Sequence, residues 1–210
     1  MTDELVFYTN PMSRGRIVRW MLEEVGVPYR TVVLDYAGAM QTPEYLGINP
    51  MGKVPTIVHD GAVVTECAAI CAYLADAFPD AGLAPALNDR AAYYRWLFFG
   101  AGPVEAAVTN KSMGVEVPPE KEAMVGYRNL DATMATLETA LSHGDYILGD
   151  RFSAADVYVG SQIAWGLMFK SIAPTLAFEA YAARLHDRPA AVRARAIDDA
   201  LLPEERRGQM

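Results

Sequence analysis

The chain has 210 residues, of which 52% are hydrophobic and 21% charged, and its formal net charge is −8. This composition is typical of a globular protein of one or two domains with an ample core, and the acidic balance excludes a nucleic-acid-binding role, which needs clustered Lys and Arg. No apolar run approaches the roughly 20 residues of a membrane span and the acidic start has no signal-peptide pattern, so we expect a cytoplasmic protein without membrane contact.

The first part of the chain alternates strand and helix patterns. Apolar, β-branched runs predict strands, and the spacing of apolar residues predicts helices. In chain order the pattern predicts a strand over 4–9, a helix from Ser13 to Gly26, a strand over 31–35, a short helix over 42–46, a strand over 54–58, a tight turn at Asp60-Gly61, a returning strand over 62–64 and a helix over 68–78. This β-α-β-α-β-β-α order predicts a thioredoxin-like domain over 1–79.

Strand patterns disappear after a Pro- and Gly-rich linker over 80–87. Helices are predicted over 88–110 with an interruption from Gly100 to Pro103, over 118–142, from Ser153 to Phe169, over 174–186 and over 190–199. Ser153 and Asp156 have the spacing of a capping box at the start of the third of these helices. We therefore expect an all-helical C-terminal domain over 88–210.

The histidines and cysteines predict no metal site. His59, His143 and His186 are far apart in the sequence and lack ligand spacing. Cys67 and Cys71 lie four residues apart within one predicted helix, which is neither a disulfide nor a CxxC spacing. A cysteine-based redox role for Cys67 is the weakest of the functions that we consider.

The segment from Val54 to Cys67 combines two features of a peptide-binding site. Pro55 has no N–H for a strand ladder, so it predicts the beginning of a strand, a candidate cis Val54-Pro55 bond and an unpaired backbone edge at Val54. Such an edge can pair with the backbone of a bound peptide. The helix that begins near Glu66 and Cys67 presents unpaired N–H groups, which suit a carboxylate. Together they predict a site for a small peptide with a carboxylate at one end.

The residues over 49–74 fit the pattern NPxGKVPxxxxDGxxxxExxAIxxYL, which closely resembles the glutathione-binding half of cytosolic glutathione transferases. The segment YILGDRFSAADVYVGS resembles the C-terminal domain of the same family. The resemblance implies a homodimer that binds glutathione through Val54, Pro55, Glu66 and Cys67. Lys53, just before Val54, is a further candidate for a glutathione carboxylate, with an ordinary exposed lysine as the alternative. The family normally has Ser at the position of Cys67, and a thiol is only a weak hydrogen-bond donor.

A glutathione transferase must convert a thiol into a nucleophilic thiolate. We expect the activating donor at the end of the first strand or the start of the first helix, where Ser13 is the first choice and Thr9 and Asn10 are alternatives. Ser13 resembles the serine or cysteine motif of the theta, zeta and beta classes, although Ser is also a common helix N-cap. An apolar cleft between the domains is expected to hold the second substrate, with five candidate residues: Met12, Phe99, Val104, Trp165 and Phe169.

The resemblance implies an enzyme that conjugates the glutathione thiolate to a small hydrophobic electrophile, as in detoxification. A glutathione-dependent isomerase, dehalogenase or disulfide-bond reductase would use the same glutathione site with a different second substrate. A non-catalytic interaction protein on the same fold is a further alternative, because a fold alone does not fix function.

Overall fold

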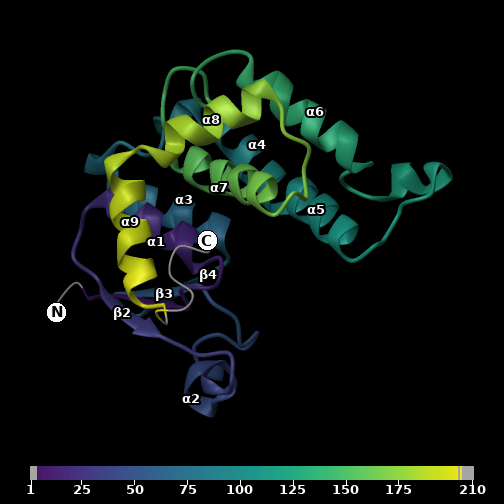
Figure 1. The fold of residues 1–210 in the computed structure, drawn as a ribbon. Helices are drawn as coiled ribbons and strands as arrows, with labels where there is room; N and C mark the ends of the chain where they lie inside the picture. Colours follow the sequence, from purple (N-terminus) through teal and green to yellow (C-terminus); the bar gives the residue numbers. More distant parts are fainter. Residues whose placement is uncertain (1–3, 203, 205–210) are drawn as a thin grey trace. The chain divides into compact units, whose positions relative to one another are not determined.

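The computed structural model describes residues 4–202 and 204 (Figure 1). Packing between Cα atoms divides the chain into two compact units, one formed by the residues up to Ala81 together with those from Arg188 onward, and the other by Gly82–Asp187. Within the described residues, no helix is both long and apolar enough to cross a membrane. The expected domain limits at residues 1 and 210 lie outside the described residues.

A four-stranded mixed sheet forms the centre of the first unit, with the order β2-β1-β3-β4. β1 pairs with β2 in parallel, and the β1–β3 and β3–β4 pairs are antiparallel. The elements of this unit before residue 82 are β1 (Leu5–Thr9), α1 (Gly15–Val25), β2 (Arg30–Val33), η1 (Ala39–Gln41), α2 (Pro43–Leu46), β3 (Thr56–His59), β4 (Ala62–Thr65), α3 (Cys67–Ala77) and η2 (Pro79–Ala81). This order confirms the predicted thioredoxin-like domain.

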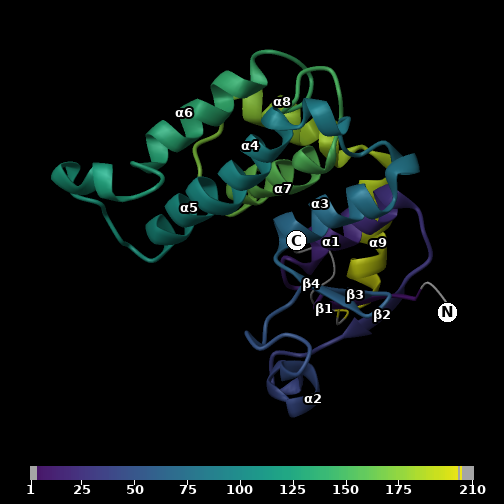
Figure 2. The same cartoon turned by 180° about the vertical axis from the view of Figure 1, so that it is seen from behind.

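Local signals in the sequence explain most boundaries of this unit. Gly26 ends α1 in the left-handed region, with φ 76°, and its N–H donates to Leu22. Asp60 and Gly61 both have positive φ and join β3 to β4, as expected for a two-residue hairpin. α1 and α3 pack on each other beside the sheet (Figure 2), and the apolar residues of both helices are largely buried. The core of this unit contains Phe7, Ile17, Val18, Met21, Leu22, Ile57, Ile70 and Leu74.

Helices make up the second unit. Its elements are η3 (Leu87–Asp89), α4 (Ala91–Phe99), the π-helical turn η4 (Gly100–Val104), α5 (Glu105–Ser112), η5 (Pro119–Met124), α6 (Leu130–Leu141), α7 (Ala154–Met168) and α8 (Leu176–His186). The interruption predicted at Gly100 to Pro103 is the π-turn, because Pro103 has no N–H for the regular helix ladder. Ser153 and Asp156 form the predicted capping box at the start of α7.

The prediction of one helix over 118–142 is wrong in its first half. η5 is a 3₁₀ segment, and α6 begins only at Leu130. Arg128 has a positive φ of 58°, which no α-helix accommodates, and the Asn129 side chain then caps the new helix by accepting the N–H of Ala132. The two prolines at 118 and 119 start the 3₁₀ segment rather than the α-helix.

The last helix, α9 (Pro189–Ala200), packs on α1 of the first unit. The sequence alone places this segment in the helical C-terminal domain over 88–210, so the structure differs from that expectation. Small apolar residues and a buried ion pair explain the docking: Ala190, Ala191 and Ala194 are buried, and Asp198 contacts Arg19 on α1. Such long-range pairs leave no periodic signal in the sequence.

Candidate functional site

Asn10 organises the turn between β1 and α1. Its Nδ2 donates to the carbonyl oxygen of Leu34 at 2.7 Å, and its Oδ1 accepts the backbone N–H of Met12 at 2.9 Å. Only 8% of the residue is exposed. Both polar ends of its side chain are used inside the protein, so Asn10 supports the turn. The amide group has two N–H donors, of which the bond to Leu34 uses one.

Ser13 stands at the start of α1 and is half-buried. Its Oγ donates to the carbonyl oxygen of Asn10 at 2.7 Å and accepts the N–H of Gly15 at 2.9 Å. The carbonyl of Asn10 also accepts the N–H of Ser13 at 3.0 Å. A hydroxyl rotates freely about its C–O bond, so the Ser13 hydrogen can turn toward a ligand while the Asn10 carbonyl keeps a partner.

Thr9, the other hydroxyl candidate, is fully buried at the end of β1. Its Oγ1 has no hydrogen-bond partner among the described residues. A Cβ placed on Gly15 would lie 1.9 Å from this oxygen, so any larger residue at position 15 would force the Thr9 side chain or the start of α1 to shift. A hydroxyl enclosed in this way reaches a ligand only after the helix start has moved.

The loop before β3 has the predicted geometry of an exposed backbone edge. The Val54-Pro55 bond is cis, and β3 begins directly afterwards. Within the described part of the chain, neither the N–H nor the C=O of Val54 has a hydrogen-bond partner. The carbonyl of Lys53, just before it, accepts the Tyr45 hydroxyl at 2.5 Å and Asn49 Nδ2 at 2.8 Å. These two buried side chains fix the loop, and the Lys53 side chain is exposed.

α3 begins at an unusual backbone conformation. Glu66, its N-cap, has φ 68° and ψ 120° and makes no side-chain capping hydrogen bond. A non-glycine residue in such a conformation costs about 1–3 kcal/mol and commonly marks a functional site. The first turn of α3 contains no acidic residue, and the positive end of its helix dipole favours an anion.

Cys67 joins the starts of the two helices. Its Sγ lies 3.6 Å from the carbonyl oxygen of Arg14 and donates to it, which brings the N-terminus of α3 next to the N-terminus of α1. The thiol is shielded, since Cys67 is 8% exposed. Cys71 is fully buried, and burial together with the neighbouring Cys67 raises the pKa of its thiol well above the usual value. The fully buried Cys71 therefore behaves as a small core residue.

The candidate residues for the second substrate have different environments. Met12 lies on the first unit and is 41% exposed, whereas Val104 in η4 is only 2% exposed and belongs to the core. Trp165 is half-buried on α7, and Phe169 follows α7 with 62% of its surface exposed. Phe99 lines a cavity within the helical unit. Val104 is thus a poor candidate for binding a substrate directly.

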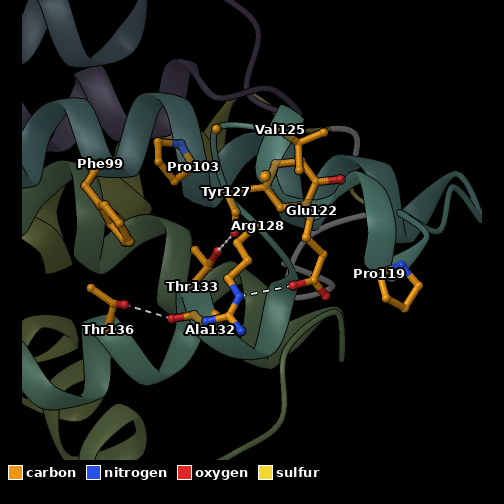
Figure 3. A pocket seen from close by; sticks show the side chains of 12 residues that line it. Phe99, Pro103, Pro119, Glu122, Val125, Tyr127, Arg128, Ala132, Thr133 and Thr136 are labelled. Carbon is orange, nitrogen blue, oxygen red and sulfur yellow. Dashed lines mark hydrogen bonds and ion pairs between the residues drawn. The ribbon is translucent and has the colours of Figure 1, made fainter.

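The cavity beside Phe99 has a volume of about 640 Å³ and lies between η4, the loop after η5 and the beginning of α6 (Figure 3). Its polar groups are paired inside the protein. Arg128 contacts Glu122 at 3.1 Å, and Thr133 Oγ1 donates to the Tyr127 carbonyl oxygen at 2.9 Å. Among the described residues, no group of three His, Cys, Asp or Glu side chains is arranged to hold a metal ion.

Comparison with known proteins identifies the family. The glutathione S-transferase N-terminal domain matches residues 12–77, and the C-terminal domain of the same family matches residues 105–165. The chain is 30% identical to a solved theta class glutathione S-transferase from Xanthomonas axonopodis pv. citri with glutathione bound, over 92% of this chain and 97% of that chain, with a TM-score of 0.72. The chain belongs to the glutathione S-transferase family.

Other relatives of this transferase agree. A solved glutathione transferase from Methylococcus capsulatus str. Bath is 28% identical, matches 94% of this chain and 100% of that chain, and has a TM-score of 0.73. Glutathione S-transferase GST-4.5 of Xanthomonas campestris pv. campestris is 29% identical over 170 residues, which is 75% of this chain and 80% of that protein. These relatives support glutathione as the co-substrate and transfer of a group to or from it as the general activity.

Proposed function

We propose that this transferase binds glutathione across the starts of α1 and α3 and conjugates its sulfur to a small hydrophobic electrophile. The observation that carries the proposal is the contact of Cys67 Sγ with the Arg14 carbonyl at 3.6 Å. It places both helix N-termini side by side in one unit, and Ser13 lies at the first of them. An anionic thiolate and an anionic carboxylate each find a helix dipole of the favourable sign there.

The backbone of glutathione has a matching partner at Val54. Its N–H and C=O lack partners among the described residues, and an extended peptide can add two hydrogen bonds to such an edge. The exposed Lys53 side chain is available for the glycyl carboxylate. At the other end of the ligand, Glu66 is assigned the γ-glutamyl ammonium and the N–H of Cys67 the γ-glutamyl carboxylate. In this assignment the Cys67 thiol takes no part, because it donates to Arg14.

Ser13 is assigned the task of stabilising the thiolate. An unperturbed thiol has a pKa of about 8.5, and a decrease of two units corresponds to about 2.7 kcal/mol. A hydrogen bond to a charged group contributes about 1.5–3 kcal/mol, and the start of α1, whose first turn has no acidic residue, adds to this. The Ser13 hydroxyl gives up its bond to Asn10, whose carbonyl keeps the N–H of Ser13.

The chemical step is a nucleophilic displacement or addition. The thiol proton leaves to solvent, and the thiolate electron pair forms a C–S bond with an electrophilic carbon. In a displacement the leaving group departs with its bonding electrons; in an addition the π electrons of the acceptor move away from that carbon and take up a proton from solvent. Met12, next to Ser13 and 41% exposed, is the candidate on the first unit for contact with the apolar part of this substrate. Cys67 and Cys71 form no disulfide, and a cytoplasmic location is part of this proposal.

A homodimer through α4 is part of this proposal. Tyr94 and Phe98 are one helical turn apart and 42% and 73% exposed, and Leu87 just before the helix is 82% exposed. Large exposed apolar side chains four residues apart on one helix suit a protein interface. Sedimentation of the Phe98→Asp variant tests this assignment. A monomeric variant supports the α4 interface, and an unchanged dimer refutes it.

Steady-state kinetics with an aromatic halide and glutathione test the catalytic assignment. We expect Ser13→Ala to lower kcat/KM by about tenfold to a hundredfold, since less of the bound thiol is ionised at neutral pH. Thr9→Val is the matched control, because it removes a hydroxyl at the neighbouring buried position. Equal losses in both variants would show that Ser13 acts only through the structure of the turn.

A further inference from the structure

Two ion pairs connect α9 to α1 within the first unit. Arg19 Nε lies 3.1 Å from Asp198 Oδ1, and each side chain is 1% exposed. Arg16 Nη2 lies 2.8 Å from Asp199 Oδ1, and these side chains are 10% and 34% exposed. Consecutive acidic residues near the end of α9 thus hold arginines that are three residues apart on α1.

Only one of these arginines also contacts the turn that carries Ser13. Arg16 Nε donates to the Pro11 carbonyl oxygen at 2.6 Å, and Pro11 itself is buried. Arg19 points elsewhere, because its Nη1 donates to the hydroxyls of Tyr29 and Thr31. The guanidinium of Arg16 therefore connects a carboxylate on α9 with the backbone two residues before Ser13.

The Arg16–Asp199 contact is shielded from water. Both Nη2 of Arg16 and Oδ1 of Asp199 are buried atoms, and they are not aligned as a hydrogen bond, so the contact is an ion pair. A buried pair is screened by salt much less than an exposed one. The fork of a guanidinium can hold a carboxylate and a carbonyl at the same time, which the single ammonium head of lysine does less well.

We propose that Asp199 is a positioning residue for the glutathione thiolate: it holds Arg16, and Arg16 in turn fixes the Pro11 carbonyl and thereby the direction of the Ser13 hydroxyl. This inference rests on the proposed function of Ser13. It gives the C-terminal helix a task in the chemistry of the first unit, although no residue of α9 belongs to the glutathione site itself.

A purely electrostatic role and a positioning role of Asp199 predict opposite changes in the thiol pKa for Asp199→Asn. Removing a nearby negative charge favours an anion through space, so the charge effect alone lowers the pKa of the bound thiol. A looser turn weakens the hydrogen bond from Ser13 to the thiolate and raises that pKa. The sign of the change therefore separates a positioning role from a purely electrostatic one.

The test is a pH titration of glutathione bound to the full-length protein, followed by the ultraviolet absorbance of its thiolate. We expect the thiol pKa to rise by about one unit in Asp199→Asn and to return in Asp199→Glu. The matched control is Arg193→Gln, which removes another α9–α1 pair, the contact of Arg193 Nε with Glu23 Oε2 at 3.2 Å, without touching the turn. This control is expected to leave the thiol pKa unchanged.

Arg16→Lys is the second variant, and it decides the question if Asp199→Asn does not fold. It keeps the positive charge but loses the branched guanidinium that contacts both Asp199 and Pro11, so the same rise in the thiol pKa is expected. An unchanged or lowered thiol pKa in these variants overturns the inference, as does an equal rise in Arg193→Gln. If the wild type itself does not lower the thiol pKa, the proposed function of Ser13 fails and the inference fails with it.

Discussion

Glu66 combines a strained backbone with an assigned binding role, so stability and affinity should respond to its replacement in opposite ways. Its φ of 68° and ψ of 120° lie outside the regions that suit residues with a Cβ. Glycine adopts positive φ without this penalty. The comparison of Glu66→Gly with Glu66→Ala isolates the backbone effect, because both variants lack the carboxylate.

The expected difference in stability between Glu66→Gly and Glu66→Ala follows from two opposing effects. Relief of the strain is worth about 1–3 kcal/mol, and the greater freedom of glycine in the unfolded chain returns about 0.5–1 kcal/mol. The net gain of about 1 kcal/mol corresponds to a Tm about 2–4 °C higher for Glu66→Gly than for Glu66→Ala in a chain of this size. Both variants should bind glutathione at least about tenfold more weakly than the wild type, since a charged hydrogen bond is lost.

Thermal unfolding without ligand and calorimetric titration with glutathione measure the two effects separately. A Glu66→Ala variant that melts at or above the temperature of Glu66→Gly would refute the strained conformation. Wild-type affinity in either variant would refute the assignment of Glu66 to the γ-glutamyl group. The combination we expect is a glycine variant that is more stable than the alanine variant and equally impaired in binding.

The remaining predictions concern polar residues that contact α1: the buried Asp198, which pairs with Arg19, and the half-buried Tyr29. Arg19→Met leaves the buried Asp198 carboxylate without its cation and should lower the free energy of unfolding, measured in urea, by about 3–5 kcal/mol. The double variant Arg19→Met with Asp198→Leu should lose less of this free energy, and equal losses in the two variants would contradict this. Burial raises the pKa of Tyr29 to about 12, with Glu23 adding to this and Arg19 opposing it. Because this folded pKa lies above the unfolded value of 10.0, the stabilisation is complete below that value and is lost as the pH rises toward 12. The stability of the wild type relative to Tyr29→Phe should therefore decrease over this pH range, and a constant difference would refute the assignment.

The parts of the fold that short-range patterns determine were predictable from the sequence. Gly26 marks the end of α1, Asp60 and Gly61 form the hairpin turn, and Pro55 precedes β3 at a cis bond. Each of these depends on the backbone preferences of one or two residues. The helix predicted from residue 118 was wrong because the break depends on the positive φ of Arg128. Arginine has no special preference for positive φ, so the residue type gave no sign of the break.

The contacts that support the site were less accessible to sequence reasoning. Tyr45 in α2 and Asn49 in the following loop both donate hydrogen bonds to the Lys53 carbonyl oxygen. Of the two, only Asn49 could be expected to stabilise a loop, because of its short amide side chain. The pairing of Arg16 with Asp199 spans nearly the whole chain, and the two charges look like ordinary surface residues in the sequence. Such contacts depend on how α9 docks on α1, which a single sequence does not specify.

The thiol pKa of glutathione bound to the wild type and to Ser13→Ala decides whether Ser13 stabilises the thiolate. We expect a wild-type value about two units below the ordinary thiol pKa of about 8.5, and a value at least about one unit higher in Ser13→Ala with binding retained. Thr9→Val should titrate like the wild type. A Ser13→Ala variant that binds glutathione with the same lowered thiol pKa as the wild type would show that Ser13 does not stabilise the thiolate.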